Sequence, residues 1–234
     1  MKTPTILGII PARGGSKGIP RKNIRLLGDK PLLAWTVQTA LQSAVLDRLI
    51  LTTEDEEIAE VGRTCGCEVL FLRPQELATD ETPGIEPVLH AINWLEAHEG
   101  YVPEFVMLLQ PTSPFRTSEQ MKQTVKQIST SNFDSLVSVV EPKHPPQWMF
   151  VKDTDKALKP LLSSERPVRR QDSPESFALN GAIYITRTTV LKRERTFMPE
   201  RTMGYVMDRL TSLDLDDMVD WKVAECLLSL VENA

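Results

Sequence analysis

Cations and glycines gather in one short segment near the start of the chain, IIPARGGSKGIPRKN at residues 9–23. A glycine-rich turn exposes backbone N–H groups that can bind an anion, and Arg13, Lys17 and Lys22 carry enough charge to neutralise a triphosphate. The segment is not a Walker A loop, because Lys17 is followed by Gly18 rather than by Ser or Thr. It follows an apolar run, and ligands of open α/β sheets bind at the carboxyl ends of strands. We therefore predict an anion site here, the alternative being a solvated basic surface.

A second segment, SLDLDD at residues 212–217, alternates leucine with aspartate. If it is a strand, Asp214 and Asp216 share one face at a spacing of roughly 6.5–7 Å, and two carboxylates on one face can share a hard divalent cation. Helix capping is the alternative, and it suits Asp217 and Asp220 at the start of the next helix. It does not account for Asp214, so the pair predicts a metal site.

Two further segments carry side chains suited to a polar ligand. Gln110 follows a buried apolar run and begins a rigid proline-containing loop; a ligand contact and a loop hydrogen bond are equally good interpretations, whereas Arg116 is expected to be structural. An arginine that binds through two hydrogen bonds is the natural partner of a carboxylate, and the segment before Asn180 offers Arg169 and Arg170 as candidates. The competing interpretation is an exposed charge in an irregular segment.

Composition limits the classes of protein that fit. The 234 residues are 41% hydrophobic and 25% charged with a net charge of −5, which is typical of a globular protein and argues against a nucleic-acid binder. Three cysteines cannot form a disulfide framework, and reduced thiols favour the cytoplasm. No apolar stretch approaches the roughly 20 residues of a membrane span, so we expect no membrane association.

These side chains must be positioned by alternating strands and helices. Apolar runs predict strands at 5–10, 49–53, 68–72, 105–109, 135–140, 182–186, 205–207 and 213–215. Helical periodicity predicts helices beginning at Pro31 and covering 55–65, 86–99, 118–129 and 218–231, the last with Val219, Val223, Cys226, Leu227 and Leu230 on its apolar face. This rhythm predicts an α/β fold with a mostly parallel sheet.

The rhythm breaks between Pro142 and Pro174, where six of the 17 prolines fall. A stretch of this length is too long for an ordinary connection. We therefore expect residues 1–234 to form a single domain, with residues 142–174 inserted as an excursion such as an extended arm, a lid or a subunit contact.

Five segments, in order, resemble the CMP-nonulosonate synthetases, also called acylneuraminate cytidylyltransferases. Besides IIPARGGSKGIPRKN they are LRPQELATD (72–80), LQPTSPFRT (109–117), NGAIYI (180–185) and SLDLDDMVDWKVAE (212–225). The related Kdo cytidylyltransferases are less similar, because their loop carries Ser-Thr-Arg where this chain has Gly-Ser-Lys-Gly.

The resemblance implies a three-layer, Rossmann-like nucleotidyltransferase domain with a small protruding dimerisation arm. It implies transfer of CMP from CTP to the anomeric hydroxyl of an acidic nine-carbon 2-keto sugar, with pyrophosphate released, Mg²⁺ (or Mn²⁺) as cofactor and a homodimer as the assembly. N-acetylneuraminic acid is the first choice of sugar; legionaminic and pseudaminic acid are alternatives. A non-catalytic nucleotide-binding module is the alternative from another class.

Site residues follow from the same resemblance, together with the loop chemistry above. The predicted nucleotide-binding residues are Arg13, Gly15, Ser16, Lys17, Lys22, Asn23 and Arg73. The predicted sugar-binding residues are Gln110, Arg170 and Asn180, the metal ligands are Asp214 and Asp216, and the catalytic residues are Lys22, Asp216 and Arg13. Some sialate-specific members carry Arg-Pro where this chain has Ala178-Leu179, which leaves the acyl sugar open.

Overall fold

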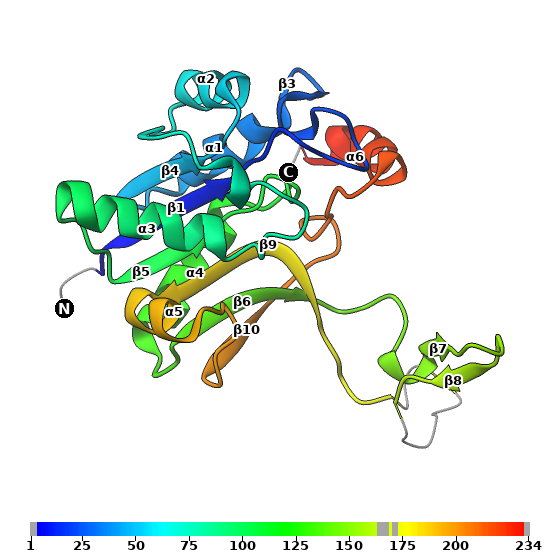
Figure 1. The fold of residues 1–234 in the computed structure, drawn as a ribbon. Coiled ribbons are helices and arrows are strands. Elements are labelled where there is room, and N and C mark those ends of the chain that lie inside the picture. The colour runs from blue at the N-terminus through cyan, green and yellow to red at the C-terminus, as the bar shows by residue number, and fades with distance from the viewer. Residues whose placement is uncertain (1–3, 163–168, 170–172, 232–234) are drawn as a thin grey trace.

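A twisted sheet lies at the centre of the molecule (Figure 1). The structure is a computed structural model that describes residues 4–162, 169 and 173–231. The sheet has the strand order β10-β6-β9-β5-β1-β4; its strands are β1 (Ile6–Pro11), β4 (Arg48–Thr52), β5 (Phe105–Leu108), β6 (Ser135–Val140), β9 (Ala178–Arg187) and β10 (Thr202–Met207). β9 runs antiparallel to β5 and β6, and the remaining pairs are parallel. The predicted mostly parallel sheet is confirmed.

Helices cover both faces of this sheet. The apolar side chains of α1 (Leu32–Ser43), α2 (Glu56–Cys65) and α4 (Ser118–Thr130) pack on one face, and those of α3 (Glu86–Glu99) and α5 (Thr188–Glu194) on the other. Because successive side chains of a strand point to opposite faces, Ile6 and Ile10 join the first cluster while Leu7 and Ile9 join the second. The resulting three layers confirm the expected architecture.

A third apolar cluster joins the glycine-rich loop to the C-terminal helix α6 (Met218–Val231). Ile19 of the loop, Leu215 and Trp221 are fully buried there together. The predicted bounds of α6 are confirmed, but the predicted apolar face is wrong: Val219, Val223 and Leu230 are exposed. The buried face is the one that carries Trp221 and Ala224, because it is this face that meets the loop.

Two predicted strands are wrong. In place of a strand at 68–72 the structure has a single β-bridge between Glu68 and Ile50. Residues 213–216 have no regular secondary structure, because their backbone pairs with a loop rather than with a strand: the Leu215 N–H donates to the Thr112 carbonyl.

Short elements complete the chain: η1 (Lys22–Ile24), β2 (Leu26–Leu27) with β3 (Lys30–Pro31), and η2 (Gln75–Leu77). Beyond η3 (Pro146–Trp148), β7 (Phe150–Lys152) pairs with β8 (Leu158–Pro160) in a hairpin that stands away from the sheet, at the right of Figure 1. This hairpin lies within the predicted arm. Among the described residues, no helix has both the length and the apolar character needed to span a membrane.

Candidate active site

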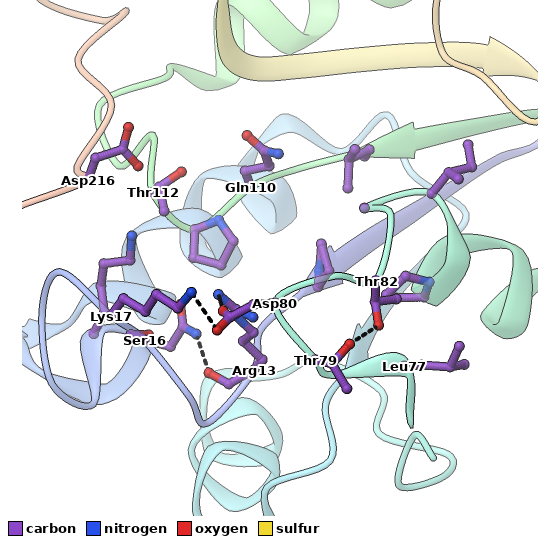
Figure 2. Close-up of a pocket in the computed structure, with 18 of the residues that line it drawn as sticks. Arg13, Ser16, Lys17, Leu77, Thr79, Asp80, Thr82, Gln110, Thr112 and Asp216 are labelled. Atoms are coloured by element: carbon purple, nitrogen blue, oxygen red, sulfur yellow. Dashed lines mark hydrogen bonds and ion pairs between the residues drawn. The ribbon is translucent and has the colours of Figure 1, made fainter. Parts of the chain in front are cut away.

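A cavity of about 700 Å³ opens beside the carboxyl ends of β1 and β5 (Figure 2). Its wall combines the glycine-rich loop, the segment from Arg73 to Pro87, the Gln110 loop and the Asp214–Asp216 segment; Tyr184 and Phe197 add an aromatic side. The volume falls within the range of about 300–1,000 Å³ that is usual for small-molecule sites. Four segments that carry predicted site residues, among them Arg73, therefore meet in one place.

The loop places two cations in this cavity. Arg13 Nη2 lies 2.7 Å and Lys17 Nζ 2.8 Å from the two carboxylate oxygens of Asp80. Ser16 also lines the cavity, whereas Gly15 does not. Asn23 is buried, and its amide donates to the Arg13 carbonyl at 2.9 Å, so it fixes the backbone from which Arg13 projects.

Behind the loop, Glu54 connects two parts of the wall. This carboxylate follows β4; it accepts a hydrogen bond from the Gly14 N–H at 2.7 Å and pairs with Arg73 Nη2 at 2.6 Å. The Arg73 and Glu54 side chains are only 2% and 8% exposed. Arg73, predicted to bind nucleotide, is thus fixed at the cavity wall by a buried partner.

Lys22 connects the loop to the acidic segment. Its Nζ donates to the Leu215 carbonyl at 2.8 Å, between the two predicted metal ligands. Burial lowers the pKa of Lys22, while attraction to Asp216 and Asp214 opposes that shift. An anionic ligand bound beside this ammonium group would therefore stabilise its charge and offset the unfavourable effect of burial.

Asp214 and Asp216 both line the cavity although they do not lie on a strand. Leu215, fully buried between them in the third apolar cluster, anchors the segment so that both neighbours remain at the wall. Burial raises the pKa of Asp214, against a hydrogen bond from Thr112. Asp216 is more exposed.

The capping interpretation holds for the following acids. Asp217 Oδ1 accepts from the N–H groups of Val219 and Asp220 at 2.7 and 3.1 Å. Asp220 Oδ2 in turn accepts from the Asp216 and Asp217 N–H groups at 2.9 and 3.1 Å. Capping thus accounts for Asp217 and Asp220 and leaves the side chains of Asp214 and Asp216 for other chemistry.

The donor set suits a hard divalent cation. Within the described residues, Asp214 Oδ1 is buried and has no hydrogen-bond partner, and no cluster of three or more His, Cys, Asp or Glu side chains is arranged to hold a metal. Mg²⁺ is usually held by one or two carboxylates together with substrate phosphates and water. Asp214 and Asp216 fit that pattern, because cations that can bind phosphates line the same cavity.

Two glycines allow the walls to approach each other. A Cβ at Gly18 would overlap the Asp216 carbonyl oxygen, so the loop can lie against the acidic segment only without a side chain there. Gly181 has φ +74°, and a Cβ there would lie 2.7 Å from Gln110 Oε1. Gly181 therefore leaves the space that the Gln110 side chain occupies at the cavity.

The remaining predicted residues differ in where they lie. Gln110 lines the cavity. Arg116 is buried and donates to Ala182 O and Thr36 Oγ1 at 2.8 and 2.9 Å, which confirms its structural role. Asn180 is buried outside the cavity wall; its side chain accepts from Ser138 Oγ at 2.6 Å and donates to Ser212 Oγ at 2.9 Å. Arg170 lies outside the described residues.

Three residues that line or support the cavity wall were not singled out from the sequence. Asp80 lies within the LRPQELATD segment, Glu54 follows β4 as Gly14 follows β1, and Thr112 lies in the Gln110 loop. An acid directly after a parallel strand was the available signal for Glu54. Asp80 had no comparable signal, because it lies in an irregular segment.

Known proteins match this chain over most of its length. The family model described as Cytidylyltransferase matches residues 7–221. An N-acylneuraminate cytidylyltransferase of Escherichia coli O18:K1:H7 is 36% identical over 94% of this chain, which spans only 51% of that relative. A CMP-N,N'-diacetyllegionaminic acid synthase of Legionella pneumophila is 35% identical over 98% of both chains, and a pseudaminic acid cytidylyltransferase of Campylobacter jejuni is 31% identical over 94% of this chain and 95% of its own length.

Solved structures share the fold at low sequence identity. A CMP:2-keto-3-deoxy-manno-octonic acid synthetase complexed with CTP has a TM-score of 0.71 at 16% identity and covers 97% of this chain and 99% of its own. A 4-diphosphocytidyl-2C-methyl-D-erythritol synthase has the same TM-score at 13% identity, with 97% and 100% covered.

Proposed function

Because this chain belongs to the cytidylyltransferase family, we propose that it transfers CMP from CTP to the anomeric hydroxyl of an acidic nine-carbon 2-keto sugar and releases pyrophosphate. One observation carries the proposal. Arg13, Lys17 and Lys22 line the same cavity as Asp214 and Asp216, so phosphate-binding cations and oxygen ligands for a cation lie within reach of one ligand. A non-catalytic nucleotide-binding module would not need the two acids.

The chain's own residues supply charge and position. Arg13, Lys17 and Lys22 neutralise the phosphates, and Arg73 lines the nucleotide side of the cavity. Lys22, held against the Leu215 carbonyl at 2.8 Å, stabilises the negative charge that develops as the sugar oxygen attacks the α-phosphorus; preorganised charge of this kind is a large source of rate enhancement. Asp216, the more exposed acid, accepts the proton of the anomeric hydroxyl.

Asp214 and Asp216 would hold Mg²⁺, with Mn²⁺ as the alternative. When bound, such a cation polarises the transferring phosphoryl group and neutralises its charge. The buried, unpartnered Oδ1 of Asp214 supports this assignment.

The sugar is recognised on the side of the cavity that carries Gln110, with Tyr184 and Phe197 as apolar walls. We propose N-acetylneuraminic acid as the substrate, with Arg170 as the partner of its carboxylate. A diacetyllegionaminic acid is the second candidate, because the Legionella relative matches this chain over 98% of both lengths. Pseudaminic acid is the third.

The assembly we propose is a homodimer formed through the arm at 142–174. The β7–β8 hairpin stands away from the sheet (Figure 1), and its apolar side chains Phe150, Val151 and Leu158 are exposed in the single chain. A hairpin of two short strands is marginally stable alone, so a partner surface would account for these side chains. Light scattering on Val151→Lys should report a monomer; an unchanged dimer would contradict this assembly.

The test of the function is product formation. The protein is incubated with CTP, Mg²⁺ and each of the three sugars, and both pyrophosphate and CMP-sugar are measured. We expect stoichiometric products with at least one sugar, strong loss of turnover in Lys22→Met, and normal turnover in the control Lys126→Met, which changes an exposed lysine of α4. CTP binding without product from any sugar would instead favour the non-catalytic module.

A further inference from the structure

Asp80 lies where the predicted phosphates of CTP would bind. Its carboxylate bridges Arg13 and Lys17 at 2.7 and 2.8 Å, and Figure 2 shows the three side chains pointing toward one another. All three line the same cavity. In the part of the chain that the structure describes, Asp80 is the acid with which both Arg13 and Lys17 form an ion pair.

A carboxylate and a phosphate make the same kind of charge-assisted hydrogen bond to arginine and lysine. Asp80 therefore uses the donors that a triphosphate needs. The Lys17 hydrogen bond, with help from Arg13, lowers the pKa of Asp80, so this competing group is charged at neutral pH.

The ion pairs of Asp80 with Arg13 and Lys17 can readily be replaced by other partners. Lys17 is 78% and Asp80 44% exposed, so water can replace either partner, and exposed pairs of this kind are weak. The buried Glu54–Arg73 pair of the same wall is the opposite case, since its side chains are 8% and 2% exposed.

Asp80 also lies in a turn that is closed by its own hydrogen bonds. The Thr79 and Thr82 hydroxyls are 2.7 Å apart, and Thr82 Oγ1 donates to the Glu76 carbonyl at 2.9 Å. Neither bond uses the Asp80 side chain. The carboxylate can consequently leave the cations without opening the turn.

We propose that Asp80 is an internal counter-anion that occupies the phosphate subsite between turnovers, is displaced when CTP binds, and returns to Arg13 and Lys17 as pyrophosphate leaves. The proposal rests on the proposed function, in which these two cations bind phosphate. Its consequence is that Asp80 weakens the binding of substrate and of product at the same subsite. Asp80 therefore raises the KM for CTP and speeds the release of pyrophosphate.

The test compares Asp80→Asn with the matched control Glu81→Gln, which neutralises the neighbouring exposed acid. Calorimetric titrations with CTP, inorganic tripolyphosphate and cytidine are made without sugar or divalent cation, so that nothing turns over. One exposed ion pair shifts an equilibrium by a factor of up to about five; with two pairs lost, we expect Asp80→Asn to lower the Kd of CTP and of tripolyphosphate by roughly tenfold. Cytidine, which has no phosphate, should bind unchanged, and Glu81→Gln should match the parent protein.

In steady-state assays the same variant should be inhibited by pyrophosphate at correspondingly lower concentration. Asp80→Ala serves as a second variant and should behave alike. Unchanged or weaker CTP and tripolyphosphate binding in both variants would overturn the proposal, since Asp80 would then organise the cations rather than compete for them. Failure of the parent protein to form product with any sugar, by contrast, would count against the proposed function and leave the binding comparison intact.

Discussion

Glu54 connects the stability of the fold with the geometry of the candidate site. It holds two parts of the cavity wall at once, through the Gly14 N–H at 2.7 Å and Arg73 Nη2 at 2.6 Å. Removing one partner of a buried ion pair costs about 3–5 kcal/mol, because the other charge stays buried without compensation. Arg73 Nε already has no hydrogen-bond partner among the described residues, so little else can compensate. Glu54→Ala should therefore lower the free energy of unfolding by about 3–5 kcal/mol.

Glu54→Gln separates charge from hydrogen bonding. The amide oxygen can still accept from Gly14 or from Arg73, but the ion pair is lost. A hydrogen bond to a charged group contributes about 1.5–3 kcal/mol, and we expect a loss in that range. The double variant Glu54→Ala/Arg73→Ala should cost less than the sum of the two single variants, because it leaves no unpaired guanidinium.

The assay is urea unfolding followed by circular dichroism, with the slope of the transition checked for constancy. The control is Glu60→Ala, which removes an exposed acid paired with Arg63 and should leave the unfolding free energy essentially unchanged. The CTP KM should rise in both Glu54 variants, since Arg73 lines the cavity. A loss of less than about 1 kcal/mol in Glu54→Ala would refute the buried-pair reasoning.

Three further predictions concern the metal acids, a histidine and the thiols. Asp214→Asn and Asp216→Asn should each lower kcat about a hundredfold or more while the fold is retained. The control Asp217→Asn should have near-normal turnover, because Asn is an equally good cap. Near-normal turnover in Asp214→Asn and Asp216→Asn would contradict the metal assignment. Burial, aided by the nearby charge of Arg73, lowers the pKa of His90. A depressed pKa contributes stability above the unfolded value of about 6.5, so stability in thermal melts should decline from pH 7 to 5.5. His90→Phe should flatten that decline, and an equally steep decline in the variant would contradict the role of His90. Burial raises the pKa of Cys67 to about 12, so iodoacetamide at pH 8 should modify the exposed Cys226 and spare Cys67, as peptide mass mapping would show; early labelling of Cys67 would contradict its burial.

Local patterns determined most of the secondary structure. Helix α3 and strand β6 have the bounds that periodicity predicts, because each carries an uninterrupted pattern with clear ends. Asp55 caps α2 by accepting from the Ile58 N–H at 3.0 Å, and Gly66 ends it with φ 98°. Such signals act within one or two turns of chain, so no tertiary contact is needed to read them.

The sequence also indicated which chemistry would be present. The loop cations and the Asp214–Asp216 pair were recognisable from residue type and spacing, and the structure brings them to one cavity. Parallel strands have their carboxyl ends at one edge, which is why segments far apart in sequence could be expected to meet there.

Tertiary structure decided the rest. The acidic segment is not a strand; its position depends on the Thr112 carbonyl and on the burial of Leu215 against Trp221, two contacts that no local pattern encodes. The same packing selected the buried face of α6, which is apolar on more than one side. The Asp80 contacts with Arg13 and Lys17, and the buried Glu54–Arg73 pair, join residues between 19 and 67 positions apart. Charge and burial at such distances depend on how the chain folds back on itself, so only the folded molecule could reveal them.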